Sequence, residues 1–183
     1  MTSPADLESI SQRLISLTGM TARKDWGKVA PNPANMDPAA PYTKIAIHHT
    51  GTRTYTHTGL ESYHINERGF ADIGYHFLIG LDGTMYEGRH LKHKGAHIGV
   101  ENAGAIGIIL LGDFHYQWWD DDDDLTTAHI ARITKLVLAI RKFFAIKALG
   151  GHREFPNQDT VCPGNALLPH VQAMRSKMGL AAP

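Results

Sequence analysis

The sequence predicts a single α/β domain in which helices cover a mainly mixed β-sheet. Apolar, β-branched runs typical of buried strands are interspersed along the chain with segments whose apolar residues recur at helical spacing, and no internal repeat is present. The 183 residues fit one domain. Because the chain has a single cysteine, it cannot form an intramolecular disulfide, and we expect a hydrophobic core to supply its stability.

Residues 1–20 predict an N-terminal helix that is part of the same domain. Ser3 followed by Pro4 is typical of a helix start, and apolar residues then recur at helical spacing as far as Leu17. Residues 30–42 are rich in Pro, Ala and Asn and show no apolar period, which indicates a surface loop or a strap across the domain.

The middle of the chain predicts two buried strands, a short helix and a hairpin. The run TKIAIHH is typical of a buried strand whose last residues, His48 and His49, emerge at the end of a sheet. Residues 59–68 predict a helix that stops at Gly69, and residues 74–88 predict a hairpin that turns at an Asp-Gly pair. The run AIGIILLGDF predicts the second buried strand.

The last third of the chain predicts a charged loop and two helices. Asp120 to Asp124 form a run of like charges, most simply a solvated loop that leads into a helix over residues 126–145. A further apolar period predicts a closing helix from Leu167 to Met178. The first of these helices carries one apolar stripe, formed by Ile133, Leu136, Val137, Ile140 and Phe144.

The composition argues against a nucleic-acid-binding domain and against a membrane-spanning protein, and it favours metal or hydrolytic chemistry. Eighteen basic residues balance eighteen acidic ones, so the charge expected of a nucleic-acid-binding domain is absent. No apolar stretch approaches the roughly 20 residues of a membrane span, and the N-terminus lacks the basic and apolar regions of a signal peptide. We therefore expect a protein made in the cytoplasm without a signal peptide. Twelve histidines favour metal or hydrolytic chemistry.

Three residues offer the donor atoms of a catalytic zinc site. His48 ends a strand, His152 follows a Gly-Gly pair, and Cys162 precedes a Pro-Gly pair. Catalytic zinc typically takes three protein ligands and leaves a fourth position open. Spacing alone leaves an alternative, in which Cys162 is a small buried hydrophobic residue and each histidine is only hydrogen-bonded.

Five segments spread from about Thr21 to Leu168 form a recognisable set. In order they are RKDWG, IAIHHTGT, ADIGYHFLIGLDGTMYEGR, GAHIGVENAGAIGIILLGDF and GGHREFPNQDTVCPGNAL. In order and character they resemble the peptidoglycan recognition protein and phage lysozyme-type family of zinc-dependent N-acetylmuramoyl-L-alanine amidases. The resemblance implies the α/β fold of that family, with residues 21–183 as a zinc amidase catalytic domain.

The resemblance implies that His48, His152 and Cys162 bind one zinc ion per chain. His48 rather than His49 matches the family ligand, which is the first residue after the apolar strand run. Since side chains alternate along a strand, His49 is then expected to point elsewhere. For His49 and for His76 we expect hydrogen-bonding roles, with direct binding of the metal as the alternative.

The resemblance also implies catalytic and substrate-binding residues. Tyr75 matches the family's catalytic tyrosine, and Thr160 stands where some members have lysine and others threonine. A threonine hydroxyl donates one hydrogen bond to a developing oxyanion but brings no positive charge. His97 and Asn102 match a pair that lines the substrate groove, with loop hydrogen bonds as the alternative role.

The reaction that the resemblance implies is hydrolysis of the amide bond between N-acetylmuramic acid and L-alanine of the stem peptide, assisted by zinc. Peptidoglycan is the expected partner, and we expect a monomer. The absence of a signal peptide fits, in this order, a phage endolysin, an interbacterial lytic effector or a cytoplasmic recycling amidase. The first two act on the cell wall in the periplasm or outside the producing cell.

Two other functions remain open from the sequence. The first is a peptidoglycan-binding module without catalysis, which Cys162 disfavours because non-catalytic relatives commonly replace it. The second is a cysteine hydrolase with Cys162 as nucleophile and His152 as base. Pro163 weakens this alternative, because it removes the backbone N–H that often supplies an oxyanion hole after the nucleophile.

Overall fold

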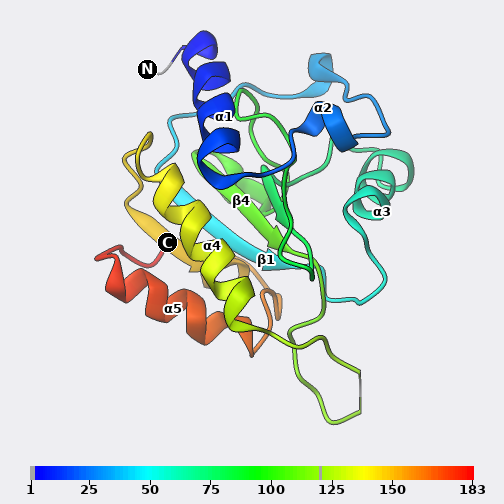
Figure 1. Cartoon of the computed structure of the whole chain (residues 1–183), viewed down its shortest axis with the longest axis vertical. Coiled ribbons are helices and arrows are strands. Elements are labelled where there is room, and N and C mark those ends of the chain that lie inside the picture. Colours follow the sequence, from blue (N-terminus) through cyan, green and yellow to red (C-terminus); the bar gives the residue numbers. More distant parts are fainter. Residues whose placement is uncertain (1–2, 120) are drawn as a thin grey trace.

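A five-stranded mixed sheet forms the centre of the molecule (Figure 1). The computed structural model describes residues 3–119 and 121–183. The strand order is β3-β2-β4-β1-β5, in which only β3 runs antiparallel to its neighbour. This confirms the predicted α/β class. The strands are β1 (Lys44–His49), β2 (Phe77–Ile79), β3 (Met85–Glu87), β4 (Ala105–Leu110) and β5 (Ala148–Gly151).

Three helices, α1 (Pro4–Thr18), α4 (Thr127–Ile140) and α5 (Leu167–Lys177), cover one face of the sheet. In Figure 1, α4 and α5 lie in front of the strands, and α1 packs against α4. Alternate residues of the strands point into this layer and are fully buried, and each such side chain contributes about 1.5–3 kcal/mol to stability. The strand residues at the centre of this core are Ile45, Ile47, Ile106, Ile108 and Leu110.

The opposite face of the sheet carries shorter elements. These are α2 (Arg23–Trp26), α3 (His57–Ser62), a π-helical turn (Tyr63–Glu67) and 3₁₀ turns at Pro33–Asn35, Gly99–Asn102 and His152–Glu154. Leu78 and Ile109 point to this side and form a smaller apolar cluster with Trp26. Along β1, Ile45 and Ile47 face the helical layer, so His48 faces the opposite side.

The ends of several elements follow the expected local chemistry. Helix α1 begins with a capping box, in which Ser3 Oγ accepts the Asp6 N–H at 3.1 Å and Asp6 Oδ2 accepts the Ser3 N–H at 2.9 Å. It ends at Gly19, which has a left-handed φ of 74°. The β2–β3 hairpin turns at Asp82 and Gly83 as predicted, and Gly83 has a φ of 78°.

The ends of two helices differ from the prediction. Helix α3 begins at His57, two residues earlier than expected, because the Thr56 hydroxyl caps it by accepting the Gly59 N–H at 3.1 Å. Helix α4 ends at Ile140 rather than residue 145, and the chain turns there towards β5. Phe144 therefore lies beyond the helix, although its ring is buried against that of Tyr42, with centroids 5.3 Å apart.

Strand β5 was not expected at all. Its sequence ends in two glycines, which have low strand propensity. Pairing with β1 nevertheless makes it an edge strand of the sheet. A Cβ atom at Gly151 would lie 2.5 Å from the ring of Pro163, so only glycine lets the chain around Cys162 approach β5 this closely.

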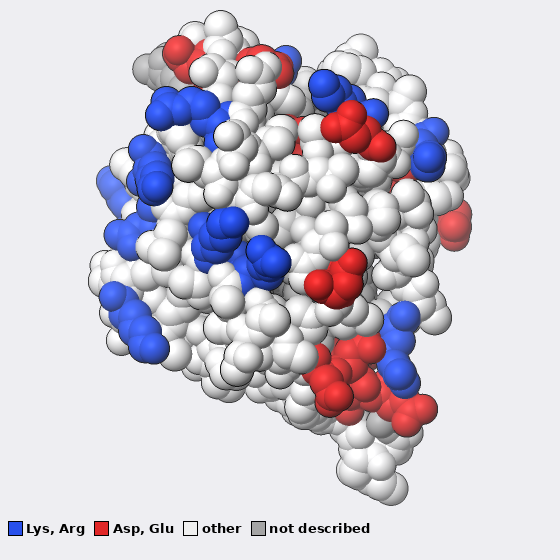
Figure 2. Space-filling model, in the orientation of Figure 1, with Lys and Arg blue, Asp and Glu red and all other residues white. Residues whose placement is uncertain are grey.

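The acidic segment forms a loop that leaves the body of the protein, at the bottom of Figure 1. Residues 121–124 contain no helix or strand, as predicted, and Asp120 lies outside the described residues. Figure 2 shows acidic side chains gathered at this end of the molecule, with Arg53 paired to Asp121 at 3.7 Å and Asp123 at 3.4 Å. None of the described helices is long and apolar enough to cross a bilayer.

Two buried histidines outside the strands fasten backbone segments together. His76 Nδ1 accepts the Gly107 N–H of β4 at 3.0 Å, and His64 Nδ1 accepts the Gly74 N–H at 3.0 Å. Burial lowers the pKa of His76 to about 3 and the pKa of His64 to about 4. Both rings are therefore neutral in the folded protein at neutral pH, and His76 has the hydrogen-bonding role expected for it.

Because the pKa values of His76 and His64 are lowered in the folded chain, we expect the fold to lose stability on mild acidification. Below about pH 6.5 the unfolded chain binds protons at both rings and the folded chain does not, so the free energy of unfolding falls as the pH falls. Each histidine contributes a slope of about 1.4 kcal/mol per pH unit until its folded pKa is reached. Urea unfolding at pH 7, 6 and 5 measures this slope. His76→Gln should make this slope shallower, and a flat profile in the parent would contradict the prediction.

Candidate metal centre

The ends of two parallel strands and one loop bring three side chains together. His48 lies near the end of β1, His152 directly follows β5, and Cys162 lies on the loop that returns from β5. One potential ligand atom from each residue lies within 4.8 Å of the other two. His48 is fully buried, whereas His152 and Cys162 are partly exposed. The structure thus assembles the three residues singled out from the sequence.

The distances within this group suit zinc. Cys162 Sγ lies 3.6 Å from His48 Nδ1. Zinc–nitrogen and zinc–sulfur bonds of about 2.0–2.3 Å at a tetrahedral ion place two ligands about 3.5 Å apart. The His48 and His152 rings are tilted against each other with centroids 4.7 Å apart. Two imidazoles and one thiol are a donor set that zinc favours, so the residues fit the metal.

Burial sets the protonation states of this group without a metal. It lowers the pKa of His48 and of His152 below the ordinary value, and neutral imidazole is the form that binds a metal. Burial also raises the pKa of the Cys162 thiol to about 12. A metal that binds here has to displace the thiol proton, which couples binding to proton release.

Tyr75 and Thr160 lie beside the three residues. The Tyr75 ring stands edge-on to the His48 ring, with centroids 5.0 Å apart. Burial, and secondly the nearby Cys162, raise the pKa of the Tyr75 phenol, so it is protonated and able to donate. The Thr160 hydroxyl accepts the Cys162 N–H at 3.2 Å and retains its own hydrogen for donation.

His97 and Asn102 are buried, and their contacts are internal. His97 Nδ1 lies 3.0 Å from His48 Nε2. Asn102 Oδ1 accepts the N–H groups of His97 and Ile98 at 2.9 and 3.0 Å, and Asn102 Nδ2 donates to the Gly99 carbonyl at 2.5 Å. The contacts of Asn102 are loop hydrogen bonds, the role given above as the alternative to lining the substrate groove. Contact with substrate stays a prediction for both residues.

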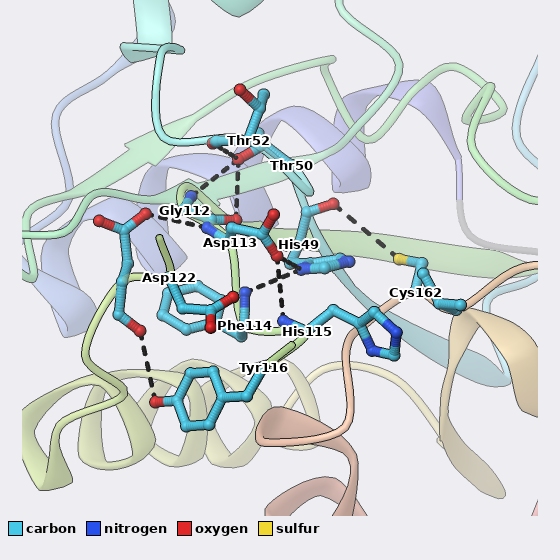
Figure 3. Close-up of polar contacts among 12 residues, drawn as sticks. His49, Thr50, Thr52, Gly112, Asp113, Phe114, His115, Tyr116, Asp122 and Cys162 are labelled. Carbon is cyan, nitrogen blue, oxygen red and sulfur yellow. Dashed lines mark hydrogen bonds and ion pairs between the residues drawn. The ribbon is translucent and has the colours of Figure 1, made fainter. Parts of the chain in front are cut away.

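His49 points to the opposite face of the sheet from His48, as strand alternation predicts. Figure 3 shows its polar contacts with the segment after β4. Its Nδ1 accepts the Phe114 N–H at 3.1 Å and lies 3.7 Å from Asp113 Oδ1. Burial lowers the pKa of His49 to about 4, so the ring is a neutral acceptor. Its carbonyl oxygen lies 3.9 Å from Cys162 Sγ. His49 therefore ties the end of β1 to the segment after β4 next to the metal centre.

One contact of the centre was missed from the sequence. Gln158 Oε1 lies 2.9 Å from His152 Nε2. Gln158 belongs to the irregular loop between His152 and Cys162, where no periodicity shows which side chains turn inward. The only available signal was its position between two proposed ligands.

Comparison with known proteins agrees with this geometry. The family model described as N-acetylmuramoyl-L-alanine amidase matches residues 38–165, which include all three side chains of the metal centre. The chain belongs to this family. The family expected from the five sequence segments is thereby confirmed.

The relatives of this amidase-family chain include both recognition proteins and amidases. It is 30% identical to peptidoglycan-recognition protein SD of Drosophila simulans over 161 residues, which cover 84% of each chain. The solved structure of the endolysin N-acetylmuramoyl-L-alanine amidase LysCS from Clostridium intestinale is 25% identical, with a TM-score of 0.72, and 90% of this chain and 99% of that one are covered. Peptidoglycan recognition protein LE, solved in complex with tracheal cytotoxin, a monomeric diaminopimelic acid-type peptidoglycan, is 27% identical with a TM-score of 0.73, over 86% of this chain and 94% of that one.

Proposed function

We propose that this chain is a zinc-dependent peptidoglycan hydrolase that cleaves the amide bond between N-acetylmuramic acid and L-alanine of the stem peptide. The observation that supports this most strongly is the cluster of His48, His152 and Cys162, whose ligand atoms lie within 4.8 Å of one another. Residues 21–183 would form the catalytic domain, with one zinc ion per chain.

In the proposed reaction, two side chains of this protein would donate hydrogen bonds to the scissile amide beside a bound zinc ion. A bound zinc ion would polarise the carbonyl group and activate water for attack. Tyr75, protonated and next to His48, would donate a hydrogen bond to the oxygen on which negative charge develops. Thr160, held next to Cys162, would donate a second one. No residue of the chain is needed as a nucleophile.

The two alternative functions are less well supported by the site. A cysteine hydrolase needs a thiolate, but burial raises the pKa of Cys162 to about 12, and the nitrogen that contacts the sulfur belongs to His48 rather than to His152. A binding module without catalysis would agree with the likeness to recognition protein LE, whose structure contains a peptidoglycan fragment. Such a module has no need of a complete set of zinc ligands with a tyrosine beside it.

The proposed reaction is compatible with more than one biological setting. A wall-degrading enzyme of the endolysin or lytic-effector kind agrees with the likeness to a clostridial endolysin, and a recycling amidase is the alternative. In either of the first two settings the enzyme would act as a monomer on the cell wall, outside the cytoplasm in which it is made.

Mass spectrometry of the products from intact sacculi tests this function. We expect free stem peptides with L-alanine at the amino terminus, together with glycan strands whose muramic acid residues have regained a free lactyl carboxyl group. Omission of zinc after treatment with a chelator is the control and should leave the sacculi uncut. Binding to sacculi without any released peptide would support the binding module instead, and sugar-terminated fragments would show that a different bond is cut.

A further inference from the structure

In both histidines of the metal centre, Nε2 is within hydrogen-bonding distance of a neutral side chain. His48 Nε2 lies 3.0 Å from His97 Nδ1, and His152 Nε2 lies 2.9 Å from Gln158 Oε1. A neutral imidazole has one donor and one acceptor nitrogen, so the partner of Nε2 decides which nitrogen is left with a lone pair.

The contacts of Gln158 settle the tautomer of His152. Gln158 Nε2 lies 3.1 Å from the Pro156 carbonyl oxygen and 3.4 Å from the Ile98 carbonyl oxygen. The NH₂ group must face these two acceptors, because the reversed amide would bring oxygen against oxygen. The carbonyl end of Gln158 therefore faces His152 and accepts a hydrogen bond from its Nε2–H. This leaves Nδ1 of His152 with its lone pair for a metal.

Two glycines make room for His97 beside His48. A Cβ atom at Gly107 of β4 would lie 2.6 Å from two atoms of the His97 ring, and one at Gly95 would lie 2.5 Å from it. Glycine within a strand often marks such a close approach. The ring is thereby confined so that its Nδ1 meets His48 Nε2. Since zinc takes an unprotonated nitrogen, His48 would bind through Nδ1 and donate a hydrogen bond from its Nε2–H to His97 Nδ1.

One loop supports both partners. Asn102 Oδ1 accepts the N–H groups of His97 and Ile98, and the Ile98 carbonyl in turn accepts from Gln158. The Gly99–Asn102 turn therefore fixes the ring of His97 and the amide of Gln158 relative to each other. Asn102 acts on the metal centre through these two residues.

We infer that His97 and Gln158 are positioning residues that present Nδ1 of His48 and Nδ1 of His152 to the zinc ion. The inference rests on the zinc site of the proposed function. In this inference His97 orients His48, and Gln158 orients His152, each by accepting a hydrogen bond from Nε2 of the ligand. Partners of this kind typically change metal affinity about 10- to 100-fold when they are removed.

The Gln158 variants separate positioning from a merely structural role. Gln158→Leu removes the acceptor and should weaken zinc binding about 10- to 100-fold. Gln158→Glu keeps an acceptor for His152 Nε2 but cannot donate to the Ile98 and Pro156 carbonyl groups, and it should bind zinc more tightly than Gln158→Leu. If Gln158 only fastened the loop, the two variants would be equally weak. Gln12→Leu, at an exposed position on α1, is the matched control and should leave zinc affinity unchanged.

The His97 variants provide an independent test on the other ligand. His97→Gln keeps a side chain that can accept from His48 Nε2, whereas His97→Phe fills the space without an acceptor. The Phe variant should bind zinc at least about tenfold more weakly than the Gln variant. Gly107→Ala, which displaces the ring without changing any polar group, should also weaken zinc binding. Circular dichroism of each metal-free variant establishes that it is folded.

The measurements are the zinc dissociation constant, from competition with a chromophoric chelator, and the visible absorption spectrum of the cobalt(II) form. The spectrum should change in the Gln158→Leu and His97→Phe variants, because the ligand geometry changes. Equal zinc affinities across both series would overturn the inference and leave the proposed function intact. Affinities in the expected order without any amide cleavage would overturn the proposed reaction and leave the inference intact. A parent protein that takes up no zinc would overturn both.

Discussion

Replacing Cys162 with serine is expected to abolish zinc binding and to reduce amide hydrolysis to background, whereas Cys162→Asp is expected to keep part of both. A serine hydroxyl stays protonated at neutral pH and is a poor zinc ligand, while a carboxylate binds zinc at about 2.0–2.2 Å. The Asp variant should still be weaker than the parent, because its carboxylate would approach the His49 carbonyl oxygen, which lies 3.9 Å from Cys162 Sγ.

Zinc content and sacculus hydrolysis, measured on the same preparations, check this order of parent, Asp and Ser. Removing zinc from the parent with a chelator should reproduce the Ser variant, and adding zinc back should restore the parent alone. A nucleophilic role for Cys162 predicts the reverse, since serine is the closer substitute for an attacking thiol. Turnover by a zinc-free Ser variant beside an inactive Asp variant that holds zinc would overturn the amidase mechanism.

Periodicity predicted those parts of the structure in which regular elements bury one face. The alternation of side chains along β1 predicts that His48 and His49 point in opposite directions, and the two rings do lie on opposite faces of the sheet. The stripe of α4 was likewise correct through Ile140. Strand β5 was not predicted, because its two glycines make room for Pro183 and Pro163, contacts that exist only in the folded chain.

The metal centre was less accessible to sequence reasoning than the fold. Two of its three side chains, His152 and Cys162, are contributed by segments without periodicity, so spacing alone left their role open. The family resemblance singled out His97 and Asn102, but their contacts in the fold are with His48 and with the backbone. Gln158 could not be predicted, because the direction of its side chain depends on carbonyl groups 2 and 60 residues away.

Tyr75→Phe is expected to lower kcat by roughly 10- to 1000-fold while zinc binding stays at the level of the parent. The change deletes one hydrogen-bond donor and keeps the ring, whose neighbours are His48 at 5.0 Å and His97 at 5.8 Å between centroids. Burial raises the pKa of Tyr75, so the lost group is a neutral phenol, and the decrease should be uniform across neutral pH.

Steady-state hydrolysis of a soluble muramoyl peptide, with zinc content and unfolding temperature measured in parallel, separates the possible causes. A donor to the developing oxyanion acts in the transition state, so kcat and kcat/KM should fall together with little change in KM. Tyr86→Phe is the matched control. Tyr86 lies on β3, at the edge of the sheet away from β1, and its ring packs against that of Trp26. If the Tyr75 variant turned over like the parent at equal stability, Tyr75 would be a packing residue beside the metal, and charge on the scissile carbonyl would have to be stabilised by Thr160 and zinc alone.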